Sequence, residues 1–159
     1  MENANSPPAV GLGTLLRSLT AQLDPVVDRI YADTVPAMKS RYYPVMRALA
    51  EREQASIGEL AAVARVSQPA MTQTVRQMVE TGLLSSDPAA DRRARTVRLS
   101  EDGMEAVQKL RPIWQAVAGA ARSLELDMEI SLESALKQAL AALEAKDFAA
   151  RIAEEREQA

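Results

Sequence analysis

Apolar residues recur every three or four positions along two long stretches of this chain. The first stretch runs from Leu12 to Ile30, and the second runs from Val107 to Leu124 and resumes from Leu132 to Leu143. A spacing of three and four places apolar side chains on one face of a helix. The pattern therefore predicts long amphipathic helices near both ends of the chain.

Prolines mark the ends of the elements in the first part of the chain. Asp24-Pro25 interrupts the first apolar stripe. Either Pro25 kinks a single helix, or Asp24 caps a second helix that has Pro25 in its first turn. Pro36 ends this region, and Pro44 is expected in the first turn of the next helix.

The last predicted helix starts at Ser131, a good N-cap residue. Phe148 and Ile152 continue its apolar face and are expected to extend it. The charged tail after Arg151 is expected to fray.

Two short helices joined by a tight turn are predicted over residues 56–82. Ser56 and Glu59 have the spacing of a capping box, which starts the first helix. Ser67 is a good N-cap for the second helix, and Pro69 suits its first turn. Gly82 is expected to end the second helix in a left-handed conformation.

The second of these helices has one apolar and one polar side. Met71, Val75 and Met78 fall on the apolar side, which is expected to face a core. The polar side is either a solvated surface or a set of side chains that read bases, because Gln pairs with adenine, Arg pairs with guanine and the Thr methyl group contacts thymine. The candidate DNA-binding residues here are Ser67, Gln68, Thr72, Gln73 and Arg76.

A short β-segment rich in arginine follows. Leu83 and Leu84 begin a short strand, and Asp87-Pro88 marks a turn. Strand-like alternation follows at Val97 and Leu99, and Ser100 is expected to cap the next helix. Closely spaced arginines repel each other, so we favour a phosphate or narrow-groove partner over a solvated loop. The residues in question are Arg92, Arg93 and Arg95, with Asp91 as the residue that orients them.

Positive charge is concentrated in the same part of the chain. The net charge of the chain is −3, but residues 41–100 hold nine arginines and six acidic residues and so carry +3. The acidic remainder keeps the chain soluble and away from phosphates. A charge difference of this size also arises by chance and adds little weight by itself.

The composition argues against an enzyme. The 159 residues include no Cys and no His, so there is no disulfide, no thiolate or imidazole metal ligand and no conventional general base. We therefore expect no catalytic residues, no metal and no cofactor. The chain also has no signal peptide and no apolar run long enough to span a bilayer, which predicts a soluble, cytoplasmic protein without a membrane partner.

The order of these elements resembles the MarR family of bacterial winged-helix regulators, over roughly residues 12–145. The most specific part is Asp91-x-Arg93 followed by Leu99-Ser100-x-x-Gly103, which is similar to the family's wing signature. The family's helix–turn–helix core is similar to Gly58–Ala61, Val66–Thr72 and Glu80–Leu84. Ser100 occupies a position where the family usually has Thr. Ser85-Ser86 follow the helix–turn–helix core where the family often has a basic residue.

The resemblance implies a mostly α fold with a small β-hairpin wing, namely a winged helix–turn–helix with dimerisation helices at both ends. It implies that Arg93 pairs with Asp91 and enters the minor groove. The corresponding segments are a flexible arm at 1–10 and a single domain at 11–159, with a DNA-binding module at 41–100 and dimerisation helices at 11–36 and 101–152.

Members of this family bind small aromatic acids or lipophilic drugs between the dimer helices and the winged module. Residues in the matching segments either line such a pocket or are ordinary core and hinge residues, and the core interpretation is favoured. They are Tyr31, Met38, Arg41, Tyr42, Tyr43, Met46, Arg47 and Trp114.

The sequence thus predicts a homodimeric transcription regulator, more simply a repressor than an activator, whose partners are double-stranded DNA, a second copy of itself and a small-molecule effector. The two distant apolar stripes favour the homodimer over an intrachain core. The alternative is a winged-helix module that binds proteins and not DNA. The retained wing arginines favour DNA.

Overall fold

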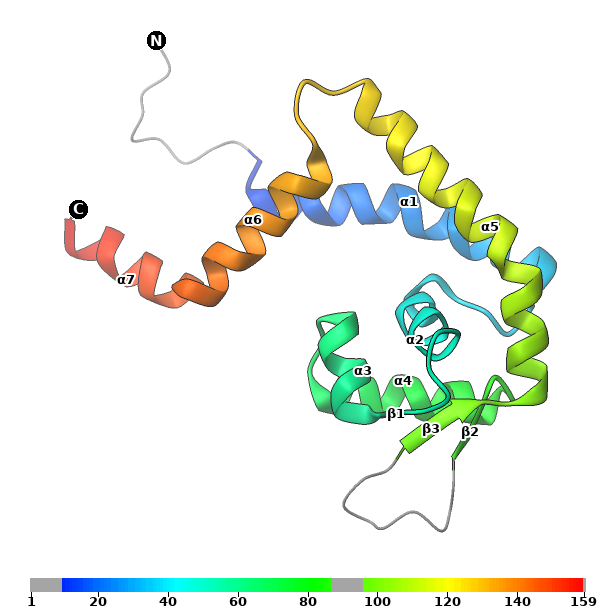
Figure 1. Cartoon of the computed structure of the whole chain (residues 1–159). Coiled ribbons are helices and arrows are strands. Elements are labelled where there is room, and N and C mark those ends of the chain that lie inside the picture. The colour runs from blue at the N-terminus through cyan, green and yellow to red at the C-terminus, as the bar shows by residue number, and fades with distance from the viewer. Residues whose placement is uncertain (1–9, 87–95, 159) are drawn as a thin grey trace. The chain divides into compact units, whose positions relative to one another are not determined.

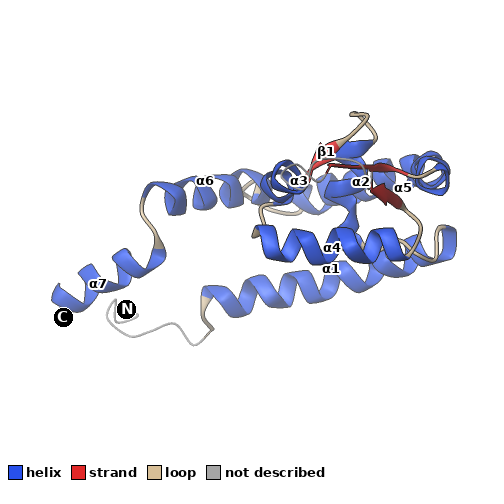
Figure 2. Cartoon of the chain, turned by 90° about the horizontal axis from the view of Figure 1, so that it is seen from below, coloured by secondary structure: helices blue, strands red, loops and turns tan. Residues whose placement is uncertain are grey.

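The computed structural model describes residues 10–86 and 96–158 and divides the chain into two compact units, with the boundary after Gln115. Helices predominate in both views, and three short strands lie together in the first unit (Figures 1 and 2). The predicted mostly helical fold with a small antiparallel β-hairpin is confirmed. In the described ranges, no helix is long and apolar enough to cross a membrane.

The first unit carries most of the elements. Its helices are α1 (Leu12–Thr34), the 3-10 turn η1 (Ser40–Tyr42), α2 (Tyr43–Leu49), α3 (Ile57–Ala64) and α4 (Gln68–Glu80), and its strands are β1 (Ala55–Ser56), β2 (Leu84–Ser86) and β3 (Thr96–Leu99). Helix α5 (Glu101–Leu126) begins in the first unit and ends in the second, which also holds α6 (Leu132–Ala145) and α7 (Phe148–Gln158).

The three strands form an antiparallel sheet in the order β1-β3-β2. Leu84 of β2 lies opposite Leu99 of β3, and Ser56 of β1 lies opposite Thr96. Helix α3 begins directly after β1, so the sheet is tied to the start of the helix pair. The central strand β3 therefore connects the β-hairpin to the helices.

One apolar core holds the first unit together. Met46 of α2, Met78 of α4 and Leu110 of α5 are each 0% exposed. Helix α3 packs on both α2 and α4, and α4 also contacts β2. Pro44 lies in the first turn of α2 as predicted, and Val45, Met46, Ala48 and Leu49 of this helix are all buried.

Helix α1 runs without a break through Asp24-Pro25, so the alternative of a second helix capped by Asp24 is wrong. Pro25 has no amide to donate to the carbonyl group of Ala21. Both residues are exposed, and water can bond to that carbonyl group. The interruption is therefore tolerated inside one long helix.

The expected extension of the last helix is also wrong, because α6 ends at Ala145 and Phe148 begins a separate helix. The Asp147 carboxylate accepts from the Ala150 amide at 2.8 Å and so caps α7. The Arg151 Nη2 donates to the Ala142 carbonyl oxygen at 2.7 Å, at the exposed end of α6. The residues after Arg151 are helical as far as Gln158, which corrects the expectation that they fray.

The end of α4, the start of β2 and the start of α5 meet at one backbone joint. The Ser100 amide donates to the Leu83 carbonyl oxygen at 3.2 Å, and the Ser100 hydroxyl donates to the Gly82 carbonyl oxygen. The same hydroxyl accepts from the Gly103 amide at 2.9 Å and caps α5. A Cβ atom on Gly103 would collide with the Leu83 carbonyl oxygen, so only glycine allows this approach.

Gly103→Ala is expected to lower the free energy of unfolding by about 1–3 kcal/mol, because rigid backbone must move to make room. Denaturation in urea measures the loss. Gly119→Ala in the same helix is the matched control, since its Cβ would meet only Arg122 Nη2 at 3.9 Å. That control should gain up to about 1 kcal/mol from helix propensity. Equal stabilities for the two variants would contradict a tight joint at Gly103.

Candidate nucleic-acid interface

The capping box at the start of α3 is present as predicted. The Ser56 hydroxyl oxygen accepts from the Glu59 amide at 3.3 Å, and the Ser56 amide donates to Glu59 Oε2 at 2.8 Å. These bonds to the amide and hydroxyl of Ser56 hold the pKa of the Glu59 carboxyl below its usual range. Because Ser56 also pairs with β3, the capping box fixes the start of α3 to the sheet.

The turn between α3 and α4 is short and sharply defined. Arg65 has a φ of 53°, the left-handed conformation that non-glycine residues rarely adopt. The amides of Arg65 and Val66 donate to the carbonyl oxygens of Ala62 and Ala61, which ends α3 at once. The chain then enters α4 at Ser67, whose hydroxyl oxygen accepts from the Ala70 amide at 3.4 Å. This geometry sets the direction in which α4 leaves α3.

Helix α4 divides into a buried and an exposed side, as the sequence predicts. Met71, Val75 and Met78 are buried. At its end, Gly82 has a φ of 78°, and the Leu83 amide donates to the Met78 carbonyl oxygen at 2.9 Å. The candidate DNA-binding residues are all exposed; they are Ser67, Gln68, Thr72, Gln73 and Arg76.

Two of the exposed side chains on α4 have partners within the helix. The Thr72 hydroxyl donates to the Gln68 carbonyl oxygen at 2.9 Å. The Arg76 Nε donates to Glu80 Oε1 at 2.8 Å. The Thr72 hydroxyl hydrogen is therefore already used in a bond within the helix. Among the described residues, the Arg76 guanidinium group is hydrogen-bonded through its Nε atom.

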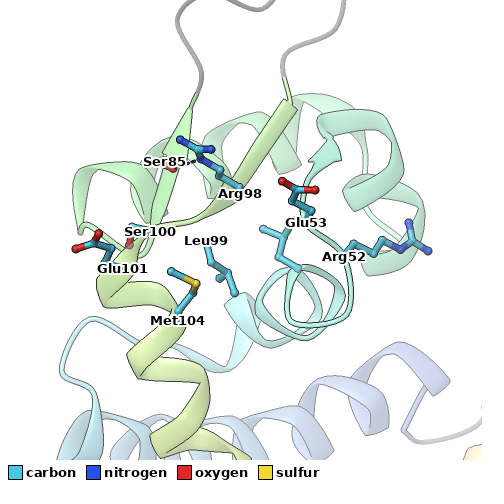
Figure 3. Close-up of a pocket in the computed structure, with 9 residues that line it drawn as sticks. Arg52, Glu53, Ser85, Arg98, Leu99, Ser100, Glu101 and Met104 are labelled. Carbon is cyan, nitrogen blue, oxygen red and sulfur yellow. Dashed lines mark hydrogen bonds between the residues drawn. The ribbon is translucent and has the colours of Figure 1, made fainter.

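The base of the β-hairpin adds a cation that the sequence analysis did not single out. Arg98 of β3 is exposed, and its Nε donates to the Ser85 hydroxyl oxygen of β2 at 3.3 Å (Figure 3). Strand alternation could have identified it, since it lies between the inward-facing positions Val97 and Leu99. Asp91, Arg92, Arg93 and Arg95 lie outside the described residues.

A shallow groove of about 540 Å³ lies beside the hairpin base (Figure 3). Its charged lining is mixed, because Arg52 and Arg98 are offset by Glu53 and Glu101. The apolar part is formed by Leu49, Leu99 and Met104, with Ser85 and Ser100 completing the wall. It contains none of the residues proposed to bind an effector, and its charges do not select for an anion or a cation.

The predicted ligand-pocket residues separate into two groups. Tyr31, Met38, Tyr42, Met46 and Trp114 belong to the apolar core of the first unit. Tyr43 is partly exposed, and its ring meets the Trp114 ring edge-on at a centroid distance of 5.3 Å. Both arginines are exposed. Arg41 Cζ lies 5.3 Å from the centre of the Tyr42 ring, and its Nη2 donates to Gln77 Oε1 of α4 at 2.9 Å, whereas Arg47 pairs with Glu51.

Polar atoms are nevertheless present within the aromatic group. Burial is the main reason that the pKa of the Tyr31 hydroxyl rises to about 12, so this hydroxyl is neutral at physiological pH. The indole of Trp114 acts on that pKa in the opposite direction, although its Nε1 is buried and does not meet the geometry of a hydrogen bond. A buried donor without a partner among the described residues is costly, so this N–H favours an additional acceptor.

Comparison with known proteins finds a family match over part of the chain and a shared fold over most of it. Residues 38–94 match the MarR family model. No curated protein matches the chain by sequence. Among solved structures, the M. tuberculosis transcriptional regulator MOSR in complex with DNA is 20% identical, with a TM-score of 0.67, and the match covers 86% of this chain and 97% of that one.

Two further structures have the same fold. A mutant of E. coli MarR complexed with operator DNA is 18% identical with a TM-score of 0.62, and the match covers 83% of this chain and 92% of that one. NadR in complex with 4-hydroxyphenylacetate is 21% identical with a TM-score of 0.54, and the match covers 90% of this chain and 96% of that one. Residues 38–94 are thus similar to the MarR family, and the chain shares the fold of these solved structures.

Proposed function

We propose that the chain is a homodimeric transcription regulator that binds DNA with sequence preference and reads it with α4. The observation that carries this proposal is the division of α4, which buries its apolar side in the core and leaves Gln68, Gln73 and Arg76 exposed in a row. Side chains of this length and type reach base edges in the major groove. The MOSR and E. coli MarR structures contain DNA, which supports the same use here.

The wing is proposed to bind DNA on the basis of the sequence. In this proposal Arg93 enters the minor groove with Asp91 as its orienting partner, and Arg92 and Arg95 contact phosphates. Arg98 is exposed at the hairpin base and adds positive charge to the proposed interface. A module that binds only proteins remains the alternative function, and it has no need for this density of arginine.

Repression is the simplest mode of regulation for such a dimer. A protein that binds over a promoter blocks polymerase directly and needs no further contact. We propose a cytoplasmic protein that acts in this way.

A small aromatic or lipophilic effector is proposed to relieve DNA binding. The proposed pocket is the aromatic group around Tyr31, Tyr43 and Trp114, where the buried indole nitrogen has no hydrogen-bond partner among the residues that the structure describes. NadR is described with 4-hydroxyphenylacetate, an aromatic acid, which supports a ligand of this class. Arg41 and Arg47 have partners outside this group, so we assign the carboxylate of such an acid to neither of them.

Gln73→Ala and Arg76→Ala are expected to relax sequence preference without lowering the melting temperature much. Each should cost about 1–3 kcal/mol of discrimination at one base pair, because a bidentate side-chain contact is lost. Fluorescence anisotropy with a selected site and its single-base variants measures this loss. Met78→Ala is the control with the opposite outcome, since removing a side chain that is 0% exposed should cost about 2–5 kcal/mol of stability. Unaltered site preference in both α4 surface variants would refute the role of α4.

Arg93→Ala is expected to weaken binding to the same site by about 1–3 kcal/mol, because a minor-groove contact is removed. Gel-shift titration at physiological salt gives the affinity, and thermal unfolding should be unchanged. An unchanged affinity would show that Arg93 does not enter the groove.

Homodimer formation is expected because long apolar faces stay exposed in the single chain. Leu12 and Leu15 of α1 are 69% and 57% exposed, and Leu140 and Leu143 of α6 are 40% and 41% exposed. Burying such faces is favourable at roughly 25 cal/mol per Å². Light scattering should give a dimer at micromolar concentration, and Leu140→Glu should shift it toward monomer. A well-folded wild-type monomer at that concentration would contradict the proposal, since two half-sites need two linked modules.

A further inference from the structure

The exposed side of α4 carries a carboxylate beside its only arginine. Glu80 lies one turn after Arg76, and the Arg76 Nε donates to Glu80 Oε1 at 2.8 Å. The two side chains are 79% and 57% exposed. The opposite side of the helix, with Met71, Val75 and Met78, is buried in the core. The ion pair therefore belongs to the surface that is proposed to face DNA.

A carboxylate at this position needs an explanation. An exposed ion pair four residues apart contributes little to stability, typically less than about 1 kcal/mol. Negative charge on a surface that approaches phosphates reduces affinity. Neither a gain in folding stability nor a gain in electrostatic affinity for DNA explains why a carboxylate lies at position 80.

The geometry of the pair supplies a reason. A guanidinium group has five N–H donors in a fixed plane, and two parallel donors contact O6 and N7 of guanine. Glu80 occupies the Nε side of Arg76, and no group among the described residues hydrogen-bonds to its Nη atoms. An arginine that is free to rotate loses conformational freedom when it binds a base, and a fixed one loses less.

We propose that Glu80 is a positioning residue for Arg76, which holds the guanidinium plane so that its Nη atoms face a guanine edge. The proposal rests on the proposed reading of DNA by α4. Sequence preference at one base pair then depends on both Arg76 and Glu80, although only Arg76 contacts the base.

The experiment begins with the base pair at which Arg76→Ala loses discrimination. At that pair, Glu80→Ala is expected to reduce discrimination about two- to tenfold, the cost of fixing a long side chain on binding. Glu80→Gln should lose less, because its amide oxygen still accepts from Arg76 Nε. In the double variant, Glu80→Ala should add nothing to Arg76→Ala, since no side chain is left to position.

A matched control exists at the end of α2. Arg47 of α2 and Glu51, two residues after this helix, form an ion pair with the same spacing, and their side chains are 45% and 60% exposed. Glu51→Ala removes the same charge and should leave discrimination at that base pair unchanged. Thermal unfolding of each variant confirms that the fold is intact.

Four outcomes would overturn the proposal. A uniform gain in affinity on all sites, with discrimination kept, would mean that Glu80 only repels phosphates. Lost preference at a different base pair would mean that Glu80 itself accepts from a cytosine amino group. If the wild type prefers one site and Glu80→Ala binds it unchanged, only the positioning role of Glu80 is refuted. A wild type without any site preference would refute the proposed function as well.

Discussion

The winged module depends on the burial of one side of α4. Met71, Val75 and Met78 enter a core that is shared with α2, α3 and the start of α5, and each buried side chain of this kind contributes about 1.5–3 kcal/mol. Ser67 and Gly82 fix the two ends of the helix, so its rotation and its length are both set. The exposed polar row is a consequence of this packing.

The sheet and α5 fix the position of the hairpin base relative to α4. Strand β3 pairs with β1, which precedes α3, and with β2, which follows α4. Ser100 and Gly103 then tie the start of α5 to the turn after α4 through close backbone contacts. A rigid hairpin base is thus built onto the helix that is proposed to read bases, and the apolar faces of α1 and α6 are left for a second copy in the proposed dimer.

Local signals explain why much of the module could be predicted from the sequence. The capping box at Ser56, the N-cap at Ser67 and the glycine stop at Gly82 act within a few residues, and all three are present. The helix break before Phe148 was missed because it depends on capping by Asp147 and on the bond between Arg151 and a carbonyl group of α6. The Arg41–Gln77 contact joins residues 36 positions apart, which no local pattern reveals. The ion pair between Arg76 and Glu80 was not predicted, although its spacing of four residues on one helix would have allowed it.

The central claim is that this chain reads a DNA sequence through α4. Binding of the purified protein to a pool of random duplexes, followed by sequencing of the retained fragments, tests it most directly. The account predicts one pseudo-palindromic motif whose half-sites are about one helical turn, or about 10 base pairs, apart. Retained fragments without a common motif, or no retention at physiological salt, would contradict it.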